Sequence, residues 1–349
     1  MTREKDDMKK TAVFLLFVLL SLFGETSLFA SSDYGTTAAN FLKVPVAPVP
    51  SGMGQAYTAM YGTDSVLYNP AALSMMSYSS ISGAHNQYFM NMTQEYLASN
   101  LRFSFGTIAA SYSSFSSGKF QGYDSEDHPY GDISAQFSSI SLTFSKSWPY
   151  FPDDRNMIDS MLVTPYWTRL RPVEDFRPKT YRFAIGASVK NISEKLDDST
   201  ANTFAFDAGA MLILPGHWQF GFSSMNNGGE VKHAVQSFPL PSVLRLGVAK
   251  DVHTKGDVMI FTFAADGVKY KDSDAYINSG LEVNIASVFQ ARVGYTTQND
   301  VLSSLTAGAG LSLDLFGVDG FMRGARIDYA FVNYSDFGAT HRIGFQVIW

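Results

Sequence analysis

The sequence predicts an all-β protein, a transmembrane antiparallel β-barrel of about 14 strands. Apolar residues recur at every second position in many segments, and polar residues stand between them. Side chains alternate between the two faces of a strand, so each such segment predicts a strand with one apolar face. Beyond residue 30, no stretch is apolar over the roughly 18 positions that a spanning helix needs.

A soluble sandwich also produces alternation, and the faces opposite the apolar ones decide between the two folds. In a sandwich the polar faces meet water, whereas in a barrel they line the interior and the apolar faces meet lipid. The chain is rich in aromatic residues (14%), poor in charged residues (17%), and ends on Trp349 within an alternating segment. An open strand edge is not tolerated in lipid, so this last strand must pair with another. We therefore expect the barrel.

Strand parity places charged residues inside this barrel. They are Arg245, Asp266, Glu282, Arg292, Arg326, Asp328 and Arg342. Positive and negative charges nearly cancel in this set, and buried charge is costly unless it is paired. We therefore predict a network of ion pairs in the lumen rather than a selective pore, which would show one dominant sign.

Composition and motifs argue against several other classes of protein. The 349 residues carry 26 Lys+Arg against 32 Asp+Glu, a net charge of −6, whereas nucleic-acid binders carry a basic footprint. Without cysteine there is no disulfide, thiolate metal site or cysteine nucleophile. No phosphate loop or Gly-x-Ser-x-Gly motif occurs, and the six histidines are scattered with no pair at metal-ligand spacing. We expect no enzyme, no cofactor and no metal.

Residues 1–30 predict a cleaved signal peptide. Lys9 and Lys10 precede an apolar run of about 14 residues, which suits a signal-peptide core and is too short to span a bilayer. Ala30 is a suitable last residue before cleavage. The alternative is an uncleaved N-terminal anchor.

Residues 31–76 do not alternate and carry a recognisable signature. Residues 51–59 (Ser-Gly-Met-Gly-Gln-Ala-Tyr-Thr-Ala), Asp64-Ser65 and residues 69–73 (Asn-Pro-Ala-Ala-Leu) resemble the N-terminal hatch of FadL-like outer-membrane proteins. The segment 35–42 adds a similarity to their PorV/PorQ (UPF0164) branch. The resemblance continues at 240–247, 292–295 and 327–342, and covers nearly the whole chain after residue 30 except an insertion at 148–180.

The resemblance implies a barrel whose lumen is occluded by the N-terminal hatch. It also implies passive transport of hydrophobic compounds or long-chain fatty acids across the bacterial outer membrane, with membrane lipid and a hydrophobic small molecule as partners. The alternative is a PorV-type carrier or assembly factor that binds proteins of a type IX-like secretion system. The candidate ligand and hatch residues are Phe41, Leu42, Gly52, Met53, Gly54, Tyr57, Asn69, Pro70 and Ala71. A purely structural turn is an equally good interpretation of Asn69-Pro70-Ala71, because an Asn amide can satisfy free backbone groups.

Residues 77–349 form the expected barrel. Its strands are predicted at 78–88, 95–104, 106–115, 132–147, 181–193, 203–214, 217–225, 242–251, 257–267, 276–285, 288–296, 304–314, 325–333 and 341–349. Tight turns at 214–217 and 285–288 alternate with long polar connections at 116–131, 226–241 and 267–275. Short turns of such barrels face the periplasm and long loops face outward, so Phe120, Tyr123, Phe238 and Leu240 are candidate outer-loop contacts for a ligand.

Two further features concern assembly and partners. Ile343, Phe345, Val347 and Trp349 share one face of the final strand and predict the signal read by the outer-membrane insertion machinery. The insertion at 148–180 follows the fourth strand, which places it in the periplasm, and it carries aromatic and apolar residues beside arginines. Such a surface suits the lipid interface or a protein partner. The alternative is a lid packed under the mouth of the barrel.

Overall fold

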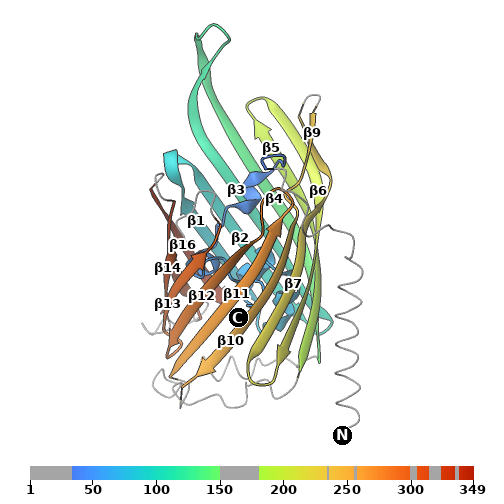
Figure 1. Ribbon diagram of the computed structural model, residues 1–349, viewed down its shortest axis with the longest axis vertical. Coiled ribbons are helices and arrows are strands. Elements are labelled where there is room, and N and C mark those ends of the chain that lie inside the picture. Colours follow the sequence, from blue (N-terminus) through green and yellow to red (C-terminus); the bar gives the residue numbers. More distant parts are fainter. Residues whose placement is uncertain are drawn as a thin grey trace.

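Antiparallel strands close into a single barrel in the computed structural model (Figure 1), which describes residues 34–149, 181–233, 236–254, 258–298, 305–313, 324–334 and 338–349. The predicted signal peptide and nearly all of the insertion at 148–180 lie outside these residues. The barrel contains 14 strands in the order β1-β16-β15-β14-β13-β12-β11-β10-β7-β6-β5-β4-β3-β2, and a separate hairpin joins β8 to β9. The predicted fold class is therefore confirmed.

The barrel strands agree with the predicted ones to within several residues at most ends. Their bounds are β1 (Ser80–Gln87), β2 (Thr93–Phe103), β3 (Gly106–Tyr123), β4 (Pro129–Trp148), β5 (Arg182–Leu196), β6 (Ser199–Leu214), β7 (Trp218–Gly228), β10 (Val243–His253), β11 (Met259–Tyr270), β12 (Tyr276–Ile285), β13 (Phe289–Thr296), β14 (Leu305–Ser312), β15 (Arg326–Asn333) and β16 (Ala339–Ile348). The small hairpin consists of β8 (Glu230–His233) and β9 (Gln236–Pro239).

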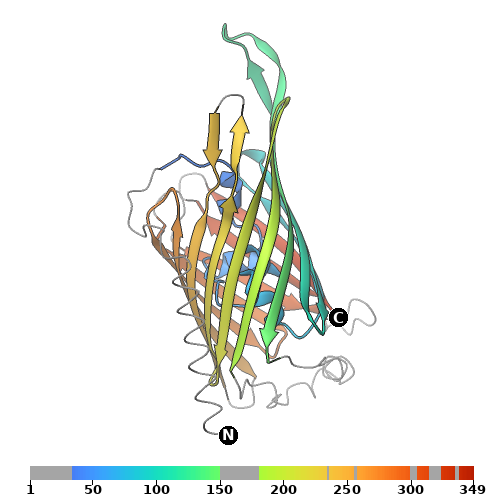
Figure 2. The same ribbon diagram turned by 90° about the vertical axis from the view of Figure 1, so that its right-hand side faces the viewer.

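The segment predicted as a loop at 116–131 is instead a long hairpin. Strands β3 and β4 have 18 and 20 residues, and their far ends project well beyond the rest of the barrel in both views (Figures 1 and 2). Phe120 and Tyr123 therefore lie on a strand, where they are 50% and 60% exposed. At the tip, the backbone N–H groups of His128 and Glu126 donate to Asp124 and lower the pKa of its carboxyl. The polar, Gly- and Ser-rich sequence gave no apolar alternation by which to recognise these strand ends.

The two ends of the barrel differ in the length of their connections. Tight turns join β2 to β3, β6 to β7 and β12 to β13, and Trp349 pairs with Ser79 at this same end through two backbone hydrogen bonds. The β3–β4 hairpin, the β8–β9 hairpin and the connection from β11 to β12 lie at the opposite end. We call these the short-turn end and the long-loop end. The connection from β4 to β5 leaves from the short-turn end, because Trp148 pairs with Phe183.

The exterior of the barrel is apolar. Large hydrophobic side chains on nearly every strand are at least 40% exposed, among them Leu97, Leu142, Phe204, Leu246, Phe263, Ile277, Val293, Leu305, Ile327, Ile343 and Phe345. Apolar surface left in water costs about 25 cal/mol per Å², so this surface suits the hydrocarbon of a bilayer. Of the predicted assembly residues, Ile343, Phe345 and Trp349 are exposed and Val347 is buried. Among the residues that the structure describes, no helix is long and apolar enough to cross a membrane.

Residues 34–79, which we call the hatch, run through the lumen from the long-loop end towards the short-turn end (Figure 2). Tyr34 donates to Asp274 in the β11–β12 connection, and Met75 accepts from Arg182 at the start of β5. Only short helical turns form in the hatch, and prolines begin two of them. These turns are η1 (Asn40–Lys43), α2 (Pro48–Gly52), η2 (Thr63–Leu67) and η3 (Pro70–Met75), while η4 (Phe89–Asn91) connects β1 to β2.

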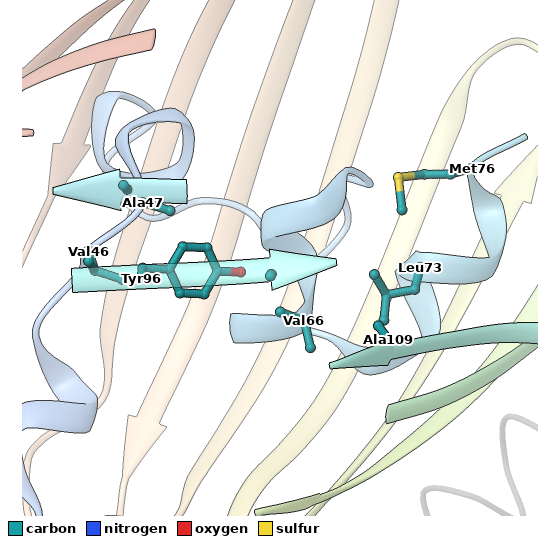
Figure 3. Packing of buried hydrophobic residues seen from close by; sticks show 9 residues of the cluster. Val46, Ala47, Val66, Leu73, Met76, Tyr96 and Ala109 are labelled. Atoms are coloured by element: carbon teal, nitrogen blue, oxygen red, sulfur yellow. The ribbon is translucent and has the colours of Figure 1, made fainter. Parts of the chain in front are cut away.

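A hydrophobic cluster joins the hatch to the barrel wall. The hatch contributes Val46, Ala47, Val66, Leu73 and Met76, and strands β1 to β3 contribute Ala84, Tyr96, Ala98 and Ala109, all less than 9% exposed. Figure 3 shows Val46 and Ala47 beside the Tyr96 ring and Leu73 beside Ala109. This cluster joins the hatch to β1, β2 and β3, and further apolar clusters join it to other strands of the wall.

Candidate functional site

Glycines on the inner face of the wall let the backbone of the hatch lie directly against the strands. A Cβ atom built at any of eight wall positions would fall within 3.2 Å of a hatch atom. These positions are Gly186, Gly209, Gly221, Gly247, Gly280, Gly294, Gly308 and Gly344. Such distances leave no room for a side chain, so the glycines form a seat for the hatch. The sequence showed glycines on the polar faces, but only the strand register reveals that they face one segment.

The closest approach is between Gly54 of the hatch and Gly294 of β13. A methyl group on Gly294 would collide with the Gly54 nitrogen, and one on Gly54 would lie 2.6 Å from the Tyr295 nitrogen. Gly54 also has a φ of +61°, a backbone conformation that side chains disfavour. Both predicted hatch glycines serve this packing, since Gly52 in turn lies against Gly308.

A buried carboxylate anchors the middle of the hatch. Asp266 of β11 accepts hydrogen bonds from the backbone N–H groups of Tyr57 and Thr58, both at 2.9 Å, and from the Thr58 hydroxyl at 2.6 Å. Asp266 is 1% exposed, so these donors replace its water. Tyr57 and Met53 are themselves buried in a second apolar cluster.

The side chain of Asn69 connects two parts of the hatch to each other and to the barrel wall. Its Nδ2 donates to the carbonyl of Thr58 at 2.9 Å and to that of Ala210 in β6 at 3.1 Å, while its Oδ1 accepts from the Ala71 N–H at 3.1 Å. The side chain is fully buried, and Pro70 follows it at the start of η3. These contacts favour the structural interpretation of Asn69-Pro70-Ala71 over direct contact with a ligand.

Four of the seven charged residues predicted in the lumen form a chain of ion pairs. Arg292 contacts Glu282 at 2.5 Å and Asp328 at 2.7 Å, and Asp328 contacts Arg326 at 2.7 Å. The chain crosses β14 because the inner-facing residue there is Gly310, which leaves space beside the Asp328 carboxylate and the Arg292 guanidinium. Two positive and two negative charges cancel, so this chain of ion pairs carries no net charge.

The other three charged residues do not join that chain, which corrects the expectation of one common network. Asp266 holds the hatch, as described above. Arg342 donates to the carbonyl of Pro45 and to the hydroxyls of Thr340 and Tyr334. Arg245 lies over the ring of Tyr68, 5.1 Å from its centroid, and near Tyr270. Within the described part of the chain, neither arginine makes an ion pair.

A cavity of about 60 Å³ remains between the hatch and the wall, lined on the hatch side by residues 41–46, Gln55 and residues 66–68. Its apolar lining includes Phe41, Leu42, Val44 and Val46, so of the nine predicted hatch residues only the first two reach it. The remaining seven seat the hatch or fill its core. Ordinary ligand pockets have roughly 300–1,000 Å³, so the cavity is too small for a hydrophobic ligand unless the hatch moves.

Three basic side chains also line the cavity. Lys43 pairs with Asp272 at 2.6 Å, and Lys190 pairs with Asp207 at 2.9 Å. Arg245 differs from both, because only its Nη2 donates, to the Tyr270 hydroxyl at 3.0 Å. Its Nε and Nη1 find no hydrogen-bond partner among the described residues although the side chain is buried. The cavity therefore combines apolar side chains with a cation that has hydrogen-bond capacity to spare.

Two of the six histidines, which have no metal-ligand spacing in the sequence, lie together in the structure. The rings of His217 and His253 have centroids 4.5 Å apart, and Asp251 lies beside both. His217 belongs to the β6–β7 turn and His253 to the end of β10, so their proximity depends on the pairing of β7 with β10. Sequence spacing alone could not have indicated it.

Comparisons with known proteins support the fold. No protein-family model matches the chain, and no curated protein matches it. Among solved structures, the toluene transporter TbuX of Ralstonia pickettii matches 86% of this chain and 97% of its own at 12% identity, with a TM-score of 0.50. A deletion mutant of the monoaromatic hydrocarbon channel TodX matches 86% of this chain and 97% of its own at 10% identity, with a TM-score of 0.51. The monoaromatic hydrocarbon channel CymD matches 87% of this chain and 97% of its own at 12% identity, with a TM-score of 0.50.

The chain has a FadL-like fold. The likeness extends over most of the chain and nearly all of each neighbour, and these neighbours are transport proteins rather than enzymes. At such low sequence identity, this structural similarity shows the fold of the chain and nothing further. The placement in the PorV/PorQ branch stays a prediction.

Proposed function

We propose that the protein is an outer-membrane channel for the passive transport of hydrophobic compounds, and that its preferred substrates are amphipathic acids such as long-chain fatty acids. The observation that carries the proposal is the cavity between the hatch and the wall, which joins apolar side chains to Arg245. The solved structures named above, whose titles describe a toluene transporter and hydrocarbon channels, support a hydrophobic substrate. The short-turn end then faces the periplasm and the long-loop end faces outward.

The apolar side of the cavity extends towards the long-loop end. Phe41 stacks on Phe137 of β4 with centroids 5.7 Å apart, and it packs in a cluster with Ile192 and Leu240. Leu240 is thus buried, whereas Phe238 on β9 is 36% exposed. A hydrocarbon tail that enters from the long-loop end would meet this apolar cluster before it reaches the cavity.

Arg245 favours an acid over a neutral hydrocarbon. A buried guanidinium with two unused donors gains a charge-assisted hydrogen bond when a carboxylate arrives, and such bonds are stronger than neutral ones. Lys43 and Lys190 already have carboxylate partners, so a ligand would compete with those partners, whereas at Arg245 it meets no such competition. A neutral aromatic compound would leave the Arg245 donors unused.

Paired ligands test this assignment. Purified protein in detergent is titrated with oleate and with oleyl alcohol, which differ only in the head group. We expect oleate to bind more tightly, and Arg245→Gln to weaken oleate binding by at least tenfold while leaving oleyl alcohol unchanged. Arg245→Lys, which keeps the charge, is the matched control and should retain part of the oleate preference. Equal binding of the two ligands by the unmodified protein would contradict the assignment, and no binding of either would contradict the channel itself. Heat-modifiable mobility in gels verifies that each variant is folded.

A further inference from the structure

We propose that His217, Asp251 and His253 form a binding site for a borderline divalent cation, with Zn²⁺ the ion that they fit best. The site lies at the short-turn end of the lumen and is independent of the transport proposed above. One ligand atom from each residue can be chosen so that all three lie within 4.8 Å of one another.

The fold brings the three side chains together from two elements. Asp251 and His253 are two residues apart on β10, so they share the inner face with Arg245 and Ala249. His217 ends the tight turn between β6 and β7, and its carbonyl accepts a hydrogen bond from the Asp251 N–H at 3.2 Å. This backbone bond fixes the turn beside the end of β10.

The donor set matches the chemistry of zinc. Two imidazoles and one carboxylate recur at zinc centres, with ligand distances of about 2.0–2.2 Å. Bonds of this length bring the ligand atoms closer to one another than 4.8 Å, so the proposal requires the imidazole rings to turn towards Asp251 when the ion binds. All three residues are partly exposed, so an ion has access, and three protein ligands leave a fourth position for water.

A second layer of residues orients the carboxylate. The Oδ2 of Asp251 accepts from the Gln219 Nε2 at 2.8 Å, and its Oδ1 accepts from the Thr262 hydroxyl at 2.7 Å. Each oxygen keeps a lone pair for an ion. Hydrogen bonds of this kind to ligating carboxylates are typical of metal sites and commonly contribute 10–100-fold to affinity.

Zinc titration of the purified full chain tests the site. The protein carries a tag without histidine, is stripped of metal with a chelator, and is titrated with Zn²⁺ by calorimetry, with bound zinc counted by mass spectrometry. We expect about one Zn²⁺ per chain, and at least tenfold weaker binding in His217→Ala and in His253→Ala. The matched control variant carries the same replacement by alanine at His85 on β1 and His341 on β16. We expect this variant to bind zinc as tightly as the unmodified protein does.

A second readout uses the unmodified chain and does not depend on whether the variants fold. Zn²⁺ should protect His217 and His253, but not His85, from modification by diethyl pyrocarbonate, as mapped by peptide mass spectrometry. Equal zinc binding by the unmodified chain and the two histidine variants, or equal modification with and without zinc, would overturn the proposal.

Discussion

The upper and lower parts of the hatch are held by different forces. Residues 34–47 contact the wall through polar groups as well as apolar side chains: Lys43 pairs with Asp272, Thr37 donates to the same carboxylate, and the Ala39 N–H donates to Glu194. Phe41, Val46 and Ala47 pack in apolar clusters with the wall. Residues 48–76 instead press their backbone against glycines and bury Asn69 completely. Polar contacts of this kind can be replaced by water or by a ligand head group when the segment moves, whereas hatch backbone packed against wall glycines leaves no space for movement. We infer that opening is confined to the upper part and that the lower part is a fixed floor.

A side chain on the glycine seat should produce the largest effect. In Gly294→Ala the new methyl group collides with Gly54, and overpacking of this kind costs about 1–3 kcal/mol. We expect a lower melting temperature and steady conductance in planar bilayers, where the unmodified protein should show little. Gly267→Ala is the matched control, because nothing lies within 4 Å of its Cβ position. Unchanged conductance and stability in Gly294→Ala would show that the floor is not seated on this glycine.

Removal of the carboxylate anchor should have an intermediate effect. Asp266→Ala leaves the N–H groups of Tyr57 and Thr58 without their acceptor, at a cost of about 1–3 kcal/mol. We expect faster proteolysis near residue 57 and a lower midpoint of chemical unfolding. Asp266→Asn keeps one acceptor oxygen and should lose less. Unchanged proteolysis and an unchanged unfolding midpoint in Asp266→Ala would show that the carboxylate does not anchor the hatch.

A change in the upper part should alter ligand access. Lys43→Met removes the ion pair with Asp272, in which the lysine is 23% exposed and the carboxylate 2%, so it leaves a buried carboxylate with one donor fewer, at a cost of about 1–3 kcal/mol. We expect faster association of oleate in stopped-flow measurements, together with a lower melting temperature. Lys119→Met on the β3–β4 hairpin removes the same charge away from the hatch and should leave association unchanged. Slower association after Lys43→Met would contradict a movable upper hatch.

The sequence predicted the strands well because one face of each meets lipid and the other does not. The apolar alternation stops where β3 and β4 extend beyond the apolar exterior of the barrel, so the sequence predicted a loop for their outer ends. The alternation of side chains along each strand correctly predicted that Arg245 and Arg342 point into the lumen. Which groups these arginines contact depends on strand register and on the position of the hatch, and the alternation carries no information about either. The same limit hid the contact of His217 with His253 and the common role of the inner glycines. The domain boundaries, the signal peptide, the terminal assembly signal, the periplasmic insertion and the secretion role stay predictions.

Disulfide locks in the two parts of the hatch test the division between them most directly, and the chain has no native cysteine to interfere. In the upper part, the Thr37 hydroxyl donates to the Asp272 carboxylate at 2.5 Å. In the lower part, the Ser145 hydroxyl donates to the Ser74 hydroxyl at 2.8 Å. Each pair is replaced by cysteines, and oleate uptake is measured in proteoliposomes before and after oxidation. We expect the upper lock to abolish uptake until a reductant is added, and the lower lock to leave uptake unchanged. Uptake that survives the upper lock but stops with the lower lock would contradict a fixed floor beneath a movable upper hatch.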